Sequence, residues 1–153
     1  DALAVALMRI RKFKDVNFAR FHPGGSLGRR LLQNAGHVMK KDSLPIVNEN
    51  DSIKKVINII SYGKCGIAVV IKNNAIIGVI SDGDIRRAME LKENNFFKLT
   101  ALDVMTKNPC TILEDTKLTS VGDLMFSKKI SSLIVQNKKN QLVGIVQAYD
   151  LGI

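Results

Sequence analysis

Residues 78–85 read Gly-Val-Ile-Ser-Asp-Gly-Asp-Ile, and their outline returns 66 positions later in residues 144–151, which read Gly-Ile-Val-Gln-Ala-Tyr-Asp-Leu. Each copy begins with glycine and two β-branched residues. Three small or polar residues, an aspartate and a bulky aliphatic residue follow. A repeat of this kind predicts two copies of one structural unit rather than a single domain.

Residues outside the motif follow the same repeat. The shift of 66 carries Val38 and Met39 onto Val104 and Met105. A shift of 65 carries four apolar residues with mostly helical spacing onto a second apolar set: Val47, Ile53, Val56 and Ile60 onto Ile112, Leu118, Val121 and Met125. The duplication therefore extends well beyond the motif.

Both copies show the same order of predicted elements: strand, helix, strand, strand, helix. In the first copy these are a strand near residue 47, a helix over 53–62, strands over 66–71 and 75–80, and a helix over 82–91. The second copy has counterparts at 111–112, 117–129, 132–136 and 142–146. A unit of about 50 residues is too small to bury its sheet alone. We therefore expect an α+β fold in which the two sheets pack against each other.

The positive charge of the chain is concentrated near its start. Of the net charge of +9, residues 1–41 carry +7, from nine Lys/Arg against two Asp/Glu, and the remainder carries +2. Because the repeated part is nearly neutral and its basic residues are not interleaved with aromatic ones, we expect no nucleic-acid partner. No apolar run is long enough for a membrane span. With only two cysteines, Cys65 and Cys110, we expect buried thiols of a cytoplasmic protein and no metal site.

Residues 1–36 form a helical arm that differs in character from the repeat. Residues 1–10 are apolar on nearly every face of a helix, so we interpret the arm as the last part of a larger domain. Residues 22–32 read His-Pro-Gly-Gly-Ser-Leu-Gly-Arg-Arg-Leu-Leu and predict a shaped loop that leads into a helix. From spacing alone this loop could meet an anionic sugar phosphate, or it could be a linker turn before a solvated basic helix.

The element order, the Val-Met openings and the Ser-x-x-Asp ending at residues 81–84 resemble tandem CBS domains, a Bateman module. The resemblance covers residues 37–153 and gives a first unit over 37–92 and a linker with a second unit over 93–153. In this family an adenosine or related nucleotide lies in a cleft between paired units. The resemblance thus implies one set of ligand-binding residues in the first copy: Val47, Gly66, Ile67, Ser81, Asp84, Arg86 and Arg87.

The chemistry of these residue types suits such a ligand. An ionised carboxylate only accepts hydrogen bonds, so Asp84 could pair with the two neighbouring hydroxyls of a ribose. Arg86 and Arg87 lie close behind it as phosphate partners. The alternative is purely structural, with Ser81 or Asp82 capping the helix that follows and Asp84 favourable in its first turn.

The second copy departs from the pattern. Gln147 stands where the family has Ser or Thr, whereas Asp150 is kept. Glutamine can still donate and accept hydrogen bonds, but it is longer, so the first cleft is favoured as the ligand site. Thr111, Ser131 and Ser132 could supply polar contacts in the second cleft.

The arm resembles the end of the sugar isomerase (SIS) domain in bacterial arabinose-5-phosphate isomerases, which interconvert ribulose 5-phosphate and arabinose 5-phosphate for octulosonate, lipopolysaccharide or capsule biosynthesis. By this resemblance His22 matches an active-site histidine of the longer enzyme, and an aldose-ketose isomerisation needs a positioned acid or base. The residues preceding the histidine lack the rest of such a site, so we predict that this chain alone is catalytically inactive.

The resemblance implies a regulatory role without a required cofactor. The expected ligand is a nucleotide such as AMP or ATP, or the CMP-activated octulosonate at the end of the pathway. Self-association through CBS pairs is also implied, as a dimer of this chain and a tetramer of the longer enzyme. The alternatives are a structural dimerisation module with empty clefts, or a CBS pair from another enzyme or a transporter.

Overall fold

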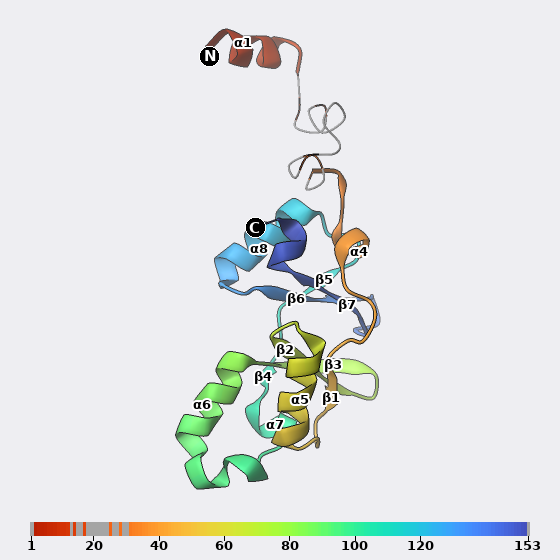
Figure 1. The fold of residues 1–153 in the computed structure, drawn as a ribbon. Coiled ribbons are helices and arrows are strands. Elements are labelled where there is room, and N and C mark those ends of the chain that lie inside the picture. The colour runs from red at the N-terminus through yellow and green to blue at the C-terminus, as the bar shows by residue number, and fades with distance from the viewer. Residues whose placement is uncertain are drawn as a thin grey trace.

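The computed structural model describes residues 2–12, 14, 17, 25, 28 and 31–152. Two α/β units lie one above the other, with the C-terminal end in the upper unit of the view (Figure 1). Helix α1 (Ala2–Ile10) lies apart from both units (Figure 1). The predicted fold, two repeated strand-and-helix units preceded by a helical arm, is confirmed.

The first unit is a four-stranded sheet with its helices on one face. The strands lie in the order β1-β2-β3-β4, with β1 parallel to β2 and the remaining neighbours antiparallel. The elements of this unit are β1 (Ile46–Asn48), α5 (Ile53–Gly63), β2 (Ile67–Lys72), β3 (Ala75–Ser81), α6 (Asp82–Lys92), η1 (Glu93–Lys98), α7 (Ala101–Val104) and β4 (Thr106–Lys107).

The second unit repeats this plan with a three-stranded sheet in the order β5-β6-β7. Again the first two strands are parallel and the last two antiparallel. Its elements are α4 (Ala35–Val38), β5 (Thr111–Leu113), α8 (Leu118–Lys128), β6 (Ser132–Gln136), β7 (Leu142–Gln147) and the 3₁₀ helix η2 (Ala148–Leu151).

Local sequence explains where the elements begin and end. At the start of α5 the hydroxyl of Ser52 accepts a hydrogen bond from the Lys55 amide at 3.4 Å, which satisfies one free backbone donor. Lys64 ends the helix in the left-handed region, with φ 54°. Asn73 and Asn74 both have positive φ, 50° and 64°, a geometry that suits a two-residue turn between antiparallel strands and that asparagine tolerates well. The hairpin of β2 and β3 follows from this pair.

The two sheets face each other across a layer of aliphatic side chains, which confirms the predicted sheet-against-sheet packing. Val69 of β2 and Ile145 of β7 are completely buried in this layer. Further buried members are Ile67, Ile76, Ile134 and Cys65. Burial of apolar area at this interface joins the units into one body, because neither sheet could cover this face by itself.

The Val-Met segments are exchanged between the units. Met105, which precedes the second copy in sequence, packs in the core of the first unit, whereas Met39 packs in the core of the second. The motif glycines make this exchange feasible: a Cβ built on Gly78 would lie 2.5 Å from Met105 Sδ, and one on Gly144 would lie 2.5 Å from Met39 Sδ. In each unit the repeated glycine therefore contacts the repeated methionine.

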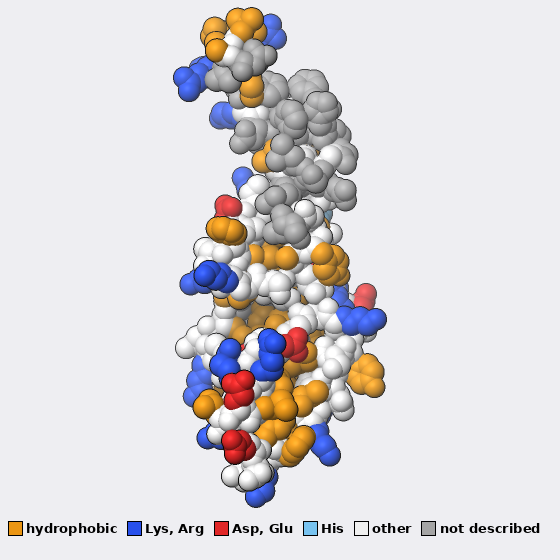
Figure 2. All heavy atoms as spheres, turned by 60° about the vertical axis from the view of Figure 1, so that its left-hand side comes forward, with side chains coloured by type: hydrophobic (Ala, Val, Ile, Leu, Met, Phe, Trp, Pro, Cys, Tyr) orange, Lys and Arg blue, Asp and Glu red, His pale blue; other side chains and the backbone are white. Residues whose placement is uncertain are grey.

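Helix α1 carries exposed apolar side chains, with Leu3 71% and Ile10 77% exposed. Hydrophobic side chains gather at the upper end of the molecule in Figure 2, where α1 lies. None of the helices in the described part of the chain is long and apolar enough to cross a membrane.

Candidate ligand-binding site

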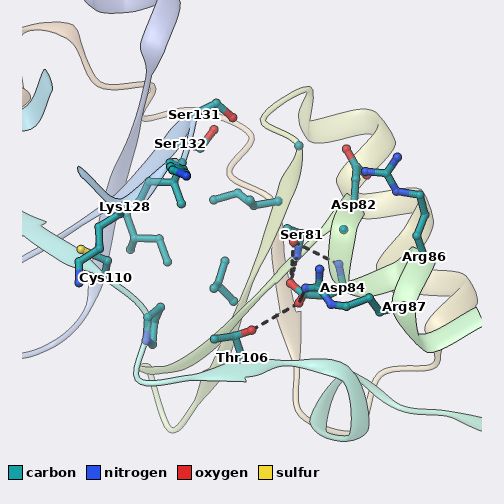
Figure 3. A pocket seen from close by; sticks show the side chains of 18 of the residues that line it. Ser81, Asp82, Asp84, Arg86, Arg87, Thr106, Cys110, Lys128, Ser131 and Ser132 are labelled. Atoms are coloured by element: carbon teal, nitrogen blue, oxygen red, sulfur yellow. Dashed lines mark hydrogen bonds and ion pairs between the residues drawn. The ribbon is translucent and has the colours of Figure 1, made fainter. Parts of the chain in front are cut away.

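A pocket of about 640 Å³ opens between the two units where β3 ends (Figure 3). One wall is formed by the end of β3 and the start of α6. The opposite wall is the turn between α8 and β6, and the segment from Thr106 to Cys110 joins the two walls. The volume lies within the range of about 300–1,000 Å³ that is typical of small-molecule sites.

Asp84 is fixed by a reciprocal cap at the start of α6. Its Oδ2 accepts hydrogen bonds from the Ser81 amide at 2.8 Å and the Ser81 hydroxyl at 2.6 Å. The Asp84 amide in turn donates to the Ser81 hydroxyl oxygen at 3.2 Å. The structural alternative for these two residues is therefore realised, since they satisfy backbone donors at the start of the helix.

The other carboxylate oxygen of Asp84, Oδ1, faces the pocket. It accepts a hydrogen bond from the guanidinium of Arg87 and a long one, 3.4 Å, from the hydroxyl of Thr106 (Figure 3). Burial alone would raise the pKa of Asp84, but the hydrogen bonds from Ser81 and Arg87 outweigh it and place the pKa below its ordinary value. Asp84 is therefore ionised at neutral pH and presents an acceptor to the pocket.

The opposite wall is basic and polar. Lys128 ends α8, and Lys129 turns the chain toward β6 with φ 54°. Ser131 and Ser132 follow at the rim, on the side of the pocket away from Asp84 (Figure 3). The Ser132 hydroxyl donates to the Cys65 carbonyl at 2.7 Å and so ties the second unit to the first.

The charged lining has an excess of positive charge. Four basic residues and two carboxylates contribute, a formal sum of +2 (four minus two): Arg86, Arg87, Lys128, Lys129, Asp82 and Asp84. Uncharged polar residues and apolar residues supply the remaining surface, the apolar ones including Ile67, Val79, Ile130 and Ile134. An anionic ligand with a flat apolar part matches this composition.

Most of the predicted binding residues lie together in this pocket: Gly66, Ile67, Ser81, Asp84, Arg86, Arg87, Ser131 and Ser132. Ser131 and Ser132, which the sequence assigned to the second cleft, thus face Asp84 of the first. Val47 is 1% exposed in the core of the first unit. Thr111 lies on β5 and Asp150 in η2, and neither lines this pocket.

Sequence reasoning missed Thr106, Asn108, Cys110, Lys128 and Lys129. Thr106 lies against the first unit because the exchange of the Val-Met segments places the residues next to Met105 there, whereas the two lysines come from the end of α8 in the second unit. The repeat could have indicated Thr106 as a candidate, because this residue directly follows the second Val-Met pair.

In the second cleft Asp150 has a similar cap, with its Oδ2 accepting from the Gln147 amide at 2.8 Å. The side chain of Gln147 does not bond to this carboxylate as Ser81 does to Asp84. Its Nε2 donates instead to the Lys64 carbonyl of the first unit at 3.1 Å.

The predicted catalytic histidine and possible metal ligands remain to be described. His22, the proposed match to a catalytic histidine, lies outside the described residues. Within the described part of the chain, no group of three or more His, Cys, Asp or Glu is placed to hold a metal ion.

Comparison with known proteins agrees with this architecture. The CBS domain model matches residues 35–91 and 101–151. Arabinose 5-phosphate isomerase KpsF of Escherichia coli is 43% identical over 151 residues, which cover 98% of this chain and 46% of that protein. The chain therefore spans less than half the length of the curated relative that it matches.

Solved structures show the same fold. CBSX2 in complex with AMP superposes with a TM-score of 0.67 at 22% identity, over 78% of this chain and 93% of that one. The CBS domain pair of protein MJ0100, solved with 5-methylthioadenosine and S-adenosyl-L-methionine, gives a TM-score of 0.68 at 25% identity over the same shares. With two matched copies that together cover more than half of its length, this chain belongs to the CBS domain family.

Proposed function

We propose that this chain is the regulatory CBS pair of an arabinose-5-phosphate isomerase and that it binds a nucleotide or nucleotide-sugar in the pocket beside Asp84. The observation that carries the proposal is the open pocket itself, which combines an ionised acceptor, a basic rim and apolar walls. The relatives at more than 40% identity support the link to the isomerase. The CBS pairs solved with AMP or S-adenosyl-L-methionine support a ligand that contains adenosine.

Asp84 is proposed to hold the sugar of the ligand. Its Oδ1 is now engaged by Arg87, whose side chain is 64% exposed and therefore free to move. Two neighbouring hydroxyls of a ribose can take the place of that guanidinium, because both are donors and the carboxylate is an acceptor. Arg87 would then turn toward the phosphate, where a planar guanidinium binds well.

The remaining parts of the pocket are proposed to contact the base and the phosphate of the ligand. The base would lie against Ile67 and Ile134, with the Gly66 backbone close to its edge. The phosphate, and any anionic group beyond it, would extend toward Lys128 and Lys129. AMP, ATP and the CMP-activated octulosonate each carry a ribose with neighbouring hydroxyls and an anionic group, so all three remain candidates.

Isothermal titration calorimetry with AMP, ATP, CMP and the CMP-sugar tests this proposal. We expect saturable binding of at least one of the four, weakened by raised salt because the rim is basic. Substitution Asp84→Asn should weaken it by a factor of roughly ten to a hundred, and a folded wild-type chain that binds none of the four ligands would contradict the proposal.

The isomerase activity itself is proposed for the longer protein only. The pocket beside Asp84 offers no arrangement for moving a proton between adjacent carbons, and we expect no turnover of ribulose 5-phosphate by this chain. Regulation requires that the ligand favours one arrangement of the longer protein over another. Measuring the activity of the full-length enzyme with and without the bound ligand tests that step.

A structural dimerisation module is the second candidate function. It is favoured by exposed apolar side chains on the helices, with Tyr62 83%, Leu91 79% and Phe126 87% exposed, and by hydrophobic side chains between charged ones on the face in Figure 2. Sedimentation of the chain without ligand should show a dimer, and in this case no nucleotide would change its melting temperature.

A further inference from the structure

The two clefts can be compared position by position because the pseudo-symmetry includes their walls. Thr106 pairs with Val79 of β3, and Lys40 pairs with Ile145 of β7. The 66-residue shift carries Val79 onto Ile145 and Lys40 onto Thr106, so Lys40 is the counterpart of Thr106. On the opposite walls, Lys64 and Lys129 each follow a helix with φ 54° and are counterparts.

In the first cleft the side chains at these positions leave the space open. Thr106 is short and its hydroxyl turns to Asp84. Ser81 is also short and bonds to the same carboxylate. The pocket of about 640 Å³ remains between these residues and Lys128.

In the second cleft the equivalent side chains cross to the other wall. Lys40 Nζ donates to the carbonyl of Gly63 at 2.7 Å, and that bond is partly buried. Gln147 Nε2 donates to the next carbonyl, that of Lys64, at 3.1 Å. Gly63 is the counterpart of Lys128 by the 65-residue shift, so these two long donors span the gap that is open in the first cleft.

We propose that the side chains of Lys40 and Gln147 fill the second cleft and limit this CBS pair to one ligand per chain. An ammonium and an amide group satisfy the carbonyls that would otherwise face a ligand. A nucleotide entering here would have to break both bonds and compete with the cation for the same space. The expectation of one bound ligand rests on the proposed function, whereas the closure of the second cleft by these two side chains does not.

The two cysteines report on the two clefts without any ligand. Cys65 is 2% exposed, and its thiol donates to the Gly63 carbonyl, the same oxygen that Lys40 contacts. Cys110 is half-buried and lines the first pocket. Burial raises the pKa of the Cys65 thiol and the neighbouring Lys40 lowers it. Alkylation by iodoacetamide, followed for each cysteine by peptide mass spectrometry over a range of pH so that rates are compared per thiolate, therefore measures access to each cleft separately.

The decisive variant is Lys40→Thr combined with Gln147→Ser, which gives the second cleft the residues of the first. We expect alkylation of Cys65 to become roughly tenfold faster or more, because the reagent gains access to its thiol. Alkylation of Cys110 should stay unchanged. Unchanged protection of Cys65 in a variant with a wild-type circular dichroism spectrum would overturn the proposal.

The reciprocal variant, Thr106→Lys combined with Ser81→Gln, tests the idea if the first variant does not fold. Here the new long side chains should cross the first cleft and slow the alkylation of Cys110, with Cys65 unaffected. An unaltered rate at Cys110 would count against closure by side-chain length.

Calorimetry of the wild-type chain with AMP separates this inference from the proposed function. One AMP per chain is expected, and two would overturn the inference. If AMP and the other nucleotides do not bind at all, the proposed function fails, while the alkylation rates still decide whether the second cleft is closed.

Discussion

The two clefts of this molecule come from one duplicated unit, yet the side chains at their walls differ: the first has a pocket of about 640 Å³ beside Asp84, whereas in the second Lys40 and Gln147 bond to the opposite wall. Their backbones correspond in strand pairing, in the capped aspartate and in the left-handed residue after the helix. They differ in side-chain length at two positions, Thr106 against Lys40 and Ser81 against Gln147. The comparison shows that duplication can preserve a fold while two long side chains change what one copy offers to a ligand.

The largest expected difference between the clefts concerns their aspartates. Asp84→Asn should weaken nucleotide binding by a factor of roughly ten to a hundred, since hydrogen bonds to a charged group contribute about 1.5–3 kcal/mol. Asp150→Asn, the matched control, removes the same charge from the second cleft and should leave the affinity unchanged. Titration calorimetry of both variants checks this, and equal losses would show that the clefts are equivalent.

The glycines that receive the exchanged methionines should differ in their tolerance of a methyl group. At Gly144 an added Cβ would meet the Lys40 carbonyl oxygen at 3.0 Å as well as Met39, whereas at Gly78 the three atoms nearest to it would all belong to the side chain of Met105. Because backbone yields less than a flexible side chain, Gly144→Ala should lower the free energy of unfolding by about 1–3 kcal/mol, and Gly78→Ala by less. Urea denaturation measures both, and the opposite order would contradict this account of the exchange.

The basic rim of the first pocket should contribute a smaller, salt-dependent part of binding. Lys128→Ala is expected to weaken nucleotide affinity severalfold at low ionic strength and less at high ionic strength, because salt screens exposed charges. Lys138→Ala removes an equal charge from the turn between β6 and β7 and serves as the control. Calorimetry at two salt concentrations should separate the two variants. Identical effects would mean that the rim acts only through net charge.

The smallest predicted effect is a pH dependence of stability. The pKa of Asp84 is lowered from its ordinary value of 3.8, so its contribution is complete well above that value and is lost as the pH falls through the folded-state pKa. Asp84→Asn should therefore reduce the drop in melting temperature between neutral and acidic pH. Thermal unfolding at about pH 7 and about pH 3 measures this drop, and an undiminished drop would show that other carboxylates account for it.

Much of the fold could be predicted from the sequence because the repeat is local and periodic. The apolar spacing of the helix from Ile53 and the glycine-led motif identify the elements, and the small size of each unit requires the sheets to face each other. The exchange of the Val-Met segments was not predicted, since it depends on long-range packing of Met39 and Met105 rather than on local pattern.

The same reason explains why the sequence predicted only some of the residues that line the candidate pocket. Ser81, Asp84 and Gly66 lie in one strand-helix unit, so their proximity follows from the hairpin. Ser131 and Ser132 come from the other unit, and only its packing across the interface brings them opposite Asp84. The role of Lys40 was not visible, because nothing in its sequence neighbourhood indicates that its side chain crosses to Gly63.

A crystal structure of this chain grown with saturating AMP or CMP-sugar tests the central claim most directly. We expect density for the ligand in the first cleft, with its ribose hydroxyls on Asp84 and Arg87 turned to the phosphate, and Lys40 still bonded to the Gly63 carbonyl. Ligand density beside Asp150 instead, or an Asp84 that keeps its bond to Arg87 with the ligand bound elsewhere, would contradict the account.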